Sequence, residues 1–197
     1  MINKAMEFAR FVFAGDASGH DFDHTLRVYH MATRLAEEEG ADLQTVQLAA
    51  LLHDVDDRKL SPETCEGKLR AVNFLKENGV ENGKIQEIVD IISRISFSAQ
   101  LAPPASIEGQ CVRDADRLDA LGAIGIARTF AYGGSRGRRM HDPEGLDQNA
   151  SIQHFYDKLL RLKDDMLTPT GRRLAEERDR YMRQFLEQFY AEWSGEK

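Results

Sequence analysis

The sequence predicts an all-α protein that folds as one domain, residues 1–197, with about eight helices. Apolar residues recur along most of the chain with the 3.6-residue period of amphipathic helices. Residues that favour helix caps stand between these periodic segments, and no segment shows the period-two alternation of a strand. The chain has 197 residues, the usual length of a single domain with a sizeable core.

The first half of the chain has the clearest helix boundaries. Gly40 is expected to end a helix, because glycine readily adopts the left-handed backbone of a C-cap. Asp42 is expected to cap the next helix, and Ser61, followed by Pro62, to start the one after it. The helices predicted here cover about 2–13, 20–39, 43–57, 62–78 and 81–95.

The second half contains two predicted loops. A pair of prolines marks the first, over residues 96–110. The second, residues 133–149, is rich in glycine and arginine, and we expect it to be mobile and to order over an anionic substrate. Helices are predicted over about 111–132, 150–166 and 168–193. We expect the last two to pack on a core formed by residues 20–130.

Composition narrows the classes of partner. The net charge of −7 argues against a surface that binds polymeric nucleic acid, but it permits a small anionic substrate in a locally cationic pocket. Cys65 and Cys111 are isolated, which is typical of the reducing cytoplasm. No apolar run approaches the ~20 residues that span a bilayer, so no membrane partner is expected. A homodimer is compatible with the sequence.

Three stretches supply residues that commonly bind metals. HDFDHTLRV contains His24, ALLHDVDD contains His53 and Asp54, and VRDADRLDA contains Asp116. Helical spacing places each of them on the apolar side of its segment, where a polar group is costly unless it is paired or binds a metal. A single inward histidine is usually a satisfied core residue. Three such stretches together favour a metal site.

The ligand types indicate which metals fit. Imidazole and carboxylate suit Mn²⁺, Fe²⁺, Co²⁺, Ni²⁺ or Zn²⁺ better than Ca²⁺. Four protein ligands would leave two octahedral positions for water and substrate. A divalent ion held this way can polarise a phosphoryl oxygen or generate hydroxide from water. We therefore expect one divalent ion, with Mn²⁺ favoured and Mg²⁺ also considered.

The same stretches carry a family resemblance. HDxxHxxRV, ALLHDxxD and DADRLDAxGAxGIAR, in this order, resemble the HD superfamily of metal-dependent phosphohydrolases. The chain is most similar to the stand-alone bacterial branch of about 200 residues, including a later HFYDKLLRLKDDM stretch. It lacks the HHExxDGxGYP element of the cyclic-di-GMP-degrading branch and the extra domains of the ppGpp enzymes. The resemblance implies an HD-type helical bundle.

The resemblance also implies roles for individual residues. The family's metal ligands correspond to His24, His53, Asp54 and Asp116. An acid/base residue three positions after the HD aspartate corresponds to Asp57. A phosphate-contacting cation directly after the last ligand corresponds to Arg117.

Three further residues are candidates for substrate binding. His20 lies one turn before His24 and is either a substrate or outer-shell contact or an ordinary helix-start residue. Arg27 lies one turn after His24 and reaches either a phosphate or an inward carboxylate. Arg128 could likewise meet a phosphate or pair with Asp119.

The function predicted from the sequence is hydrolysis of a small phosphorylated substrate, a nucleotide mono- or triphosphate, by metal-activated water. One rival is a non-catalytic HD module that binds a nucleotide or metal and signals to a partner. The other is an HD-type oxygenase with two irons, which would need additional inward ligands that the HDVDD stretch does not clearly supply.

Overall fold

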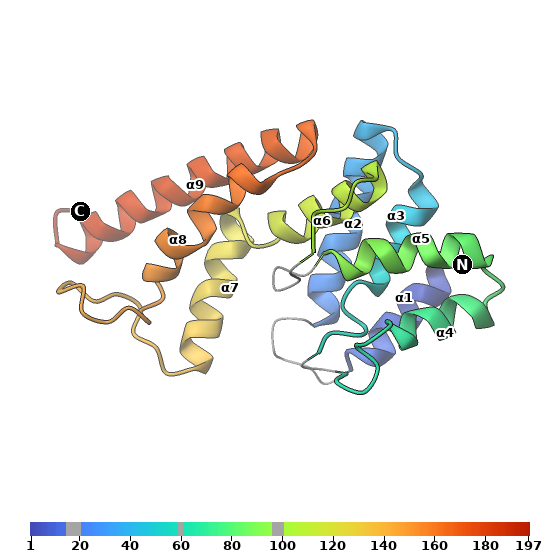
Figure 1. The fold of residues 1–197 in the computed structure, drawn as a ribbon. Coiled ribbons are helices and arrows are strands. Elements are labelled where there is room, and N and C mark those ends of the chain that lie inside the picture. Colours follow the sequence, from blue (N-terminus) through green and yellow to red (C-terminus); the bar gives the residue numbers. More distant parts are fainter. Residues whose placement is uncertain (15–20, 59–60, 96–100) are drawn as a thin grey trace. The chain divides into compact units, whose positions relative to one another are not determined.

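The computed structural model describes residues 1–14, 21–58, 61–95 and 101–197 (Figure 1). Within these residues the regular structure is entirely helical, which confirms the all-α prediction. They form nine α-helices and one 3-10 helix, η1, where about eight helices were expected. In the described part of the chain, no helix is long and apolar enough to cross a membrane. The chain divides into two units, Met1–Asp116 and Arg117–Lys197.

The first unit is organised around α3, which packs against α1, α2 and α5 (Figure 1). Most of α3 is buried on all sides, from Thr45 to Leu52, as expected for a helix that is apolar around its whole circumference. Its neighbours contribute apolar faces, such as Val28 and Leu35 of α2 and Ile88 of α5. The helices are α1 (Ile2–Val12), α2 (Phe22–Glu39), α3 (Leu43–Leu52), α4 (Leu69–Glu77), α5 (Asn82–Ser93) and α6 (Ile107–Leu118).

Two predicted caps are confirmed. Gly40 ends α2 in the left-handed conformation, at φ 71°. Asp42 caps α3, and its side chain accepts a hydrogen bond from the Thr45 backbone N–H at 2.8 Å. Together they fix the short connection between the two helices that carry the histidines.

Two boundaries in this unit were predicted wrongly. The third helix ends at Leu52 and not near Asp57, because the chain leaves the helix in a series of turns directly at His53. Ser61 does not cap a helix: its hydroxyl donates to the carbonyl of Val55 at 3.1 Å. Residues 62–68 form turns, and α4 begins only at Leu69. The left-handed backbone of Gly67 and Lys68 prevents an earlier start of a right-handed helix.

The helix predicted over 111–132 is two helices, α6 and α7 (Gly122–Ser135). Gly122 has φ 70°, which interrupts the helix, and α6 starts at Ile107, inside the predicted loop. The loop predicted from 133 therefore begins at 136, because α7 continues to Ser135.

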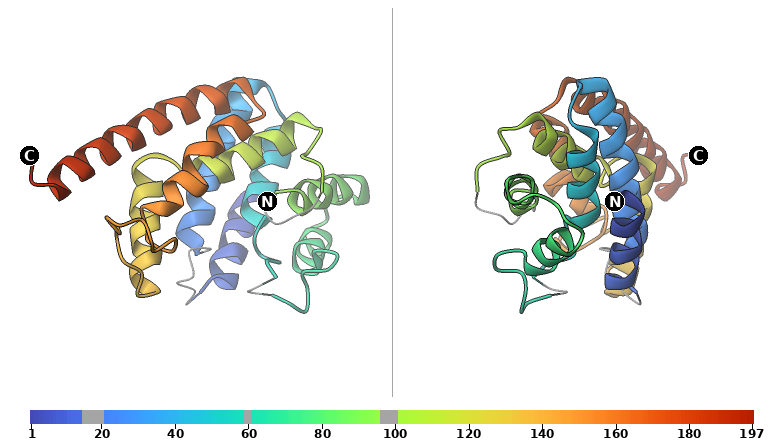
Figure 2. Two further views of the ribbon diagram at one scale, coloured as in Figure 1. Left: turned by 60° about the vertical axis from the view of Figure 1, so that its left-hand side comes forward. Right: turned by 90° about the vertical axis from the view of Figure 1, so that its right-hand side faces the viewer.

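The second unit holds α7, α8 (Gln153–Asp157), η1 (Leu159–Asp165) and α9 (Pro169–Trp193). The predicted helix 150–166 is thus a short α-helix followed by a 3-10 helix, separated at Lys158, whose φ of −136° is not helical. The long α9 packs against α7 and η1 (Figure 2). Aromatic rings fill the space between these elements: Phe130, Phe155, Phe185 and Phe189.

Candidate metal centre

His53 is placed at the end of the buried helix α3, as its C-cap residue. Its imidazole is almost fully buried, and Nδ1 lies 2.8 Å from the carbonyl oxygen of Ala50. Because a carbonyl only accepts, Nδ1 carries the proton of this hydrogen bond, and the neutral ring keeps a lone pair on Nε2. Nε2 is buried and makes no hydrogen bond within the described structure. A buried, unprotonated ring nitrogen of this kind is suited to bind a metal.

His24 approaches from the first turn of α2. Asp21 caps that helix by accepting the backbone N–H of His24 itself at 2.8 Å, which fixes where the side chain starts. The imidazole is 3% exposed, and its ring centroid lies 5.4 Å from that of His53, edge to face. Its Nε2 lies 3.7 Å from Asp54 Oδ2 and 3.4 Å from Asp116 Oδ1.

The two carboxylates complete the cluster. Asp54 Oδ2 lies 3.2 Å from His53 Nε2, a close approach whose geometry is not that of a hydrogen bond. One ligand atom each from His24, His53 and Asp54 lies within 4.8 Å of the others, so a single ion could contact all three. Asp116, on α6, joins the group through His24. The structure therefore brings together the four residues that the sequence predicted as ligands.

The electrostatics of the cluster are those of a cation site. Burial opposes a charged imidazolium at His53, but the nearby carboxylates of Asp54 and Asp116 outweigh it, and the pKa of His53 is raised. At Asp116, burial is outweighed by His24 and His53, and the pKa of that carboxyl is lowered. The carbonyl end of α3 also favours positive charge at this point. The donor set and the buried Nε2 of His53 thus fit a divalent ion.

Comparison with known proteins shows the family to which this chain belongs. The HD domain matches residues 21–121, which include all four predicted ligands. The chain belongs to the HD-domain family. The resemblance read from the sequence motifs is therefore confirmed.

Several relatives resemble this HD protein along most of its length. The Bacillus subtilis protein YpgQ is 44% identical over 90% of this chain and 86% of its own. The crystal structure of an HD-superfamily hydrolase from Bacillus thuringiensis has 47% identity and a TM-score of 0.85, and covers 98% of this chain and 96% of its own. The crystal structure of YpgQ in complex with ADP has a TM-score of 0.81 at 35% identity in the structural alignment, and covers 98% of this chain and 97% of its own.

The structure describes three of the four remaining predicted site residues. Asp57 is half-buried and lies beyond the end of α3, outside the helix in which it was predicted, while its chemical role stays a prediction. Arg27 is half-buried on α2, one turn after His24, and Arg117 is buried on α6, directly after Asp116. His20 lies outside the described residues.

The sequence did not single out Asp56, which lies between the HD pair and Asp57. Asp56 is fully buried, and both of its carboxylate oxygens accept backbone N–H groups of α4, from Arg70 and Ala71. In the string HDVDD nothing distinguishes it from its neighbours, because its partners lie 14 and 15 residues further along the chain.

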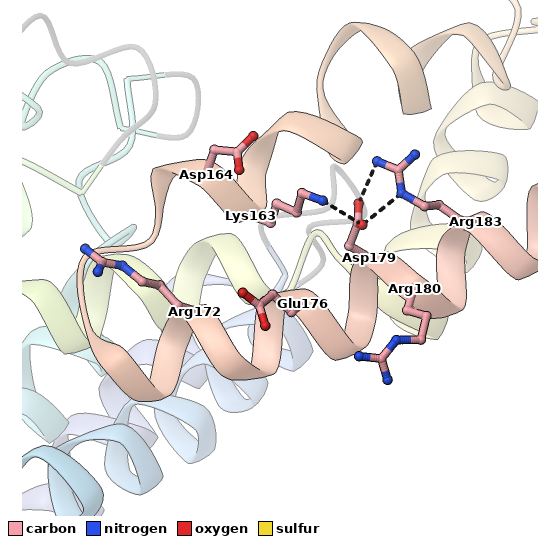
Figure 3. Close-up of a pocket in the computed structure, with 7 residues that line it drawn as sticks. All are labelled: Lys163, Asp164, Arg172, Glu176, Asp179, Arg180 and Arg183. Atoms are coloured by element: carbon pink, nitrogen blue, oxygen red, sulfur yellow. Dashed lines mark hydrogen bonds and ion pairs between the residues drawn. The ribbon is translucent and has the colours of Figure 1, made fainter.

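In the second unit, charged residues have mainly structural partners. Arg128 pairs with the buried Asp119, which is one of the two roles considered for this arginine from the sequence. A polar cleft of about 670 Å³ between η1 and α9 is lined entirely by charged side chains (Figure 3). At its centre the buried Asp179 accepts Lys163 Nζ at 3.1 Å and Arg183 Nε at 2.9 Å. The ion pair of Lys163 with Asp179 joins η1 to α9. Because the carboxylates that line the cleft offset most of its cations, the cleft offers no clear anion site.

The predicted loop makes several contacts within the same unit. The His141 ring meets Phe189, Tyr190 and Trp193 edge to face, at centroid distances of 5.9, 5.3 and 5.1 Å. Arg139 pairs with Asp142 at 3.0 Å. The ring contacts of His141 hold this part of the loop near the end of α9, and the proposed closure over a substrate stays a prediction.

Proposed function

We propose that this HD protein is a divalent-metal-dependent phosphohydrolase that uses water to cleave a phosphate ester or anhydride bond of a nucleotide. The observation that carries the proposal is the His24–His53–Asp54 cluster, with the buried Nε2 of His53 directed at its neighbours. The ADP complex of the relative YpgQ supports a nucleotide as the class of substrate. The net charge of −7 supports a small molecule over polymeric nucleic acid.

In this proposal, His24, His53, Asp54 and Asp116 hold one ion, with Mn²⁺ favoured. When bound, such an ion polarises a phosphoryl oxygen and lowers the pKa of a coordinated water. The protein's own contribution is to fix the ligands. The hydrogen bond from His53 Nδ1 to Ala50 keeps Nε2 available, and the Asp21 cap sets the position of His24.

Other residues act on the substrate. Asp57 is proposed as the acid/base group that takes a proton from the attacking water or gives one to the leaving oxygen. Arg27 and Arg117 are proposed to contact phosphate oxygens, as is His20. Guanidinium groups suit this role because they offer paired donors to a phosphate.

A panel of nucleoside mono-, di- and triphosphates, incubated with the Mn²⁺-loaded protein and separated by chromatography, tests the proposal. We expect release of phosphate or pyrophosphate from at least one nucleotide, and loss of that release in His53→Ala. His30→Ala is the matched control, because His30 is an exposed histidine on the same helix as His24. Equal turnover in His53→Ala and wild type would contradict the assignment of the site.

The alternative is a non-catalytic module that binds a nucleotide and signals to a partner. The complex of YpgQ with ADP is compatible with a binding role as well as with turnover, so it supports this alternative too. The same panel separates the two. Tight nucleotide binding by calorimetry, without any product in the presence of Mn²⁺, would favour the module.

A further inference from the structure

We propose that Asp56 is a positioning residue, which ties the turn carrying His53 and Asp54 to the N-terminus of α4 and so holds the metal ligands in place. The proposal rests on the metal site proposed above. Asp56 does not belong to the ligand cluster, and its role is to act through its neighbours.

The contacts of Asp56 join two distant parts of the first unit. Its Oδ1 accepts the backbone N–H of Arg70 at 3.1 Å, and its Oδ2 accepts that of Ala71 at 3.0 Å. The side chain has no exposed surface. A buried carboxylate is costly unless its oxygens are hydrogen-bonded, and here both oxygens are.

The helix at the other end lacks a cap of its own. The first N–H groups of any α-helix have no partner within the helix, and a side chain just before the helix usually accepts one of them. In α4 that position is Lys68, which has a left-handed backbone and makes no side-chain cap hydrogen bond. Asp56 therefore does from a remote turn what an N-cap residue does locally, with its negative charge at the favoured end of the helix.

The turn that it anchors is not regular. The helical ladder of α3 ends at Leu52, and beyond it the backbone is held by short contacts such as Asp57 N to Asp54 O at 2.9 Å. The hydroxyl of Ser61 adds a second tie, at the carbonyl of Val55. Because residues 53–56 lack a helix to fix them, the direction of Asp54 depends on contacts such as those of Asp56, only two residues away.

Calorimetric titration of the metal-free full chain with Mn²⁺ tests this inference in Asp56→Asn and Asp56→Ala. Asparagine keeps one oxygen acceptor and alanine keeps none, so we expect a graded loss of affinity. Outer residues that orient metal ligands typically change metal affinity by about 10–100-fold, and we expect the alanine variant in this range. Amide hydrogen exchange at residues 70 and 71 should accelerate in the same order.

Leu75→Ala is the matched control. Leu75 is fully buried on α4, so its truncation weakens the packing of that helix while both hydrogen bonds of Asp56 keep their partners. At a temperature where all variants are folded, Leu75→Ala should keep the wild-type Kd for Mn²⁺. If Asp56→Ala folds poorly, the comparison of Asp56→Asn with Leu75→Ala decides.

Two results would overturn the inference, and they are distinguishable. Wild-type Mn²⁺ affinity in the Asp56 variants, with faster exchange at residues 70 and 71, would leave Asp56 as a helix cap only. Absence of Mn²⁺ binding in the wild-type chain would instead overturn the proposed metal site, and this inference with it.

Discussion

Binding of Mn²⁺ should stabilise the wild-type protein and should fail to stabilise His53→Ala. A ligand that binds only the folded state, at 100 times its Kd, adds about 2.7 kcal/mol to the free energy of unfolding. For a chain of 197 residues, each kcal/mol raises Tm by about 2–4 °C. The expected shift in the wild-type protein is therefore about 5–11 °C.

The His53→Ala variant removes one of the four proposed ligands and leaves His24, Asp54 and Asp116. If affinity falls a hundredfold, the same Mn²⁺ concentration adds only RT ln 2, about 0.4 kcal/mol, and the shift falls to about 1–2 °C. The substitution also removes a buried side chain and its hydrogen bond to Ala50. It should thus lower Tm without metal, which is why the metal-induced increment is the quantity to compare.

The measurement is differential scanning calorimetry after dialysis against a chelator, with and without added Mn²⁺. His30→Ala should show the full wild-type increment, because His30 is exposed and is not a member of the cluster. An undiminished Mn²⁺ increment in His53→Ala would refute the assignment of Nε2 as a ligand atom.

Three further outcomes are expected. Asp57→Asn should keep its Mn²⁺ affinity and lose about 10²–10⁴-fold in kcat in steady-state assays; a wild-type rate across the pH range would make Asp57 a surface carboxylate. Asp179→Asn should cost about 1–3 kcal/mol in urea unfolding at pH 7. Burial opposes the charge of Asp179, but its cationic partners outweigh burial and lower its pKa. The contribution of Asp179 to the free energy of unfolding is therefore present above the unfolded pKa of 3.8 and is lost as pH falls through the folded pKa. A constant difference in unfolding free energy between the variant and wild type down to about pH 2 would contradict this. Amide exchange in residues 136–149 should slow on addition of Mn²⁺ and nucleotide, and should be faster in His141→Ala than in wild type; equal protection with and without nucleotide would exclude a lid.

The sequence was sufficient to single out the four residues of the proposed metal site, which the fold brings together, because their signals are local. His24, His53 and Asp116 each follow the apolar period of their own segment, and that period survives in the fold as burial or partial burial. Gly40 and Asp42 were predicted correctly for the same reason, since a cap is decided by the residue and its nearest neighbours. Family motifs then supplied the order in which these segments meet.

The errors have the opposite origin. Ser61 followed by Pro62 is a good local signal for a helix start, but the Ser61 hydroxyl donates to the carbonyl of Val55 instead. The helix α4 starts further along, where the Asp56 carboxylate accepts its first backbone N–H groups. The glycine at 122 interrupts what the apolar period alone presents as one helix. In each case a contact or a backbone angle of the fold overrides the preference that the apolar period or the cap signal indicates.

The position of the site at helix ends explains how a buried cluster of charges is compatible with the fold. The helix α3 is buried along its length, so a side chain at its end reaches the interior without crossing the surface. There the carbonyl groups of the last turn favour a cation, and the carboxylates of Asp54 and Asp116 add to the same field. The same carboxylates raise the pKa of His53 against the effect of its burial. A divalent ion would be attracted by the same carboxylates, so the feature that raises the pKa of His53 is also the one that suits the cluster to bind a metal.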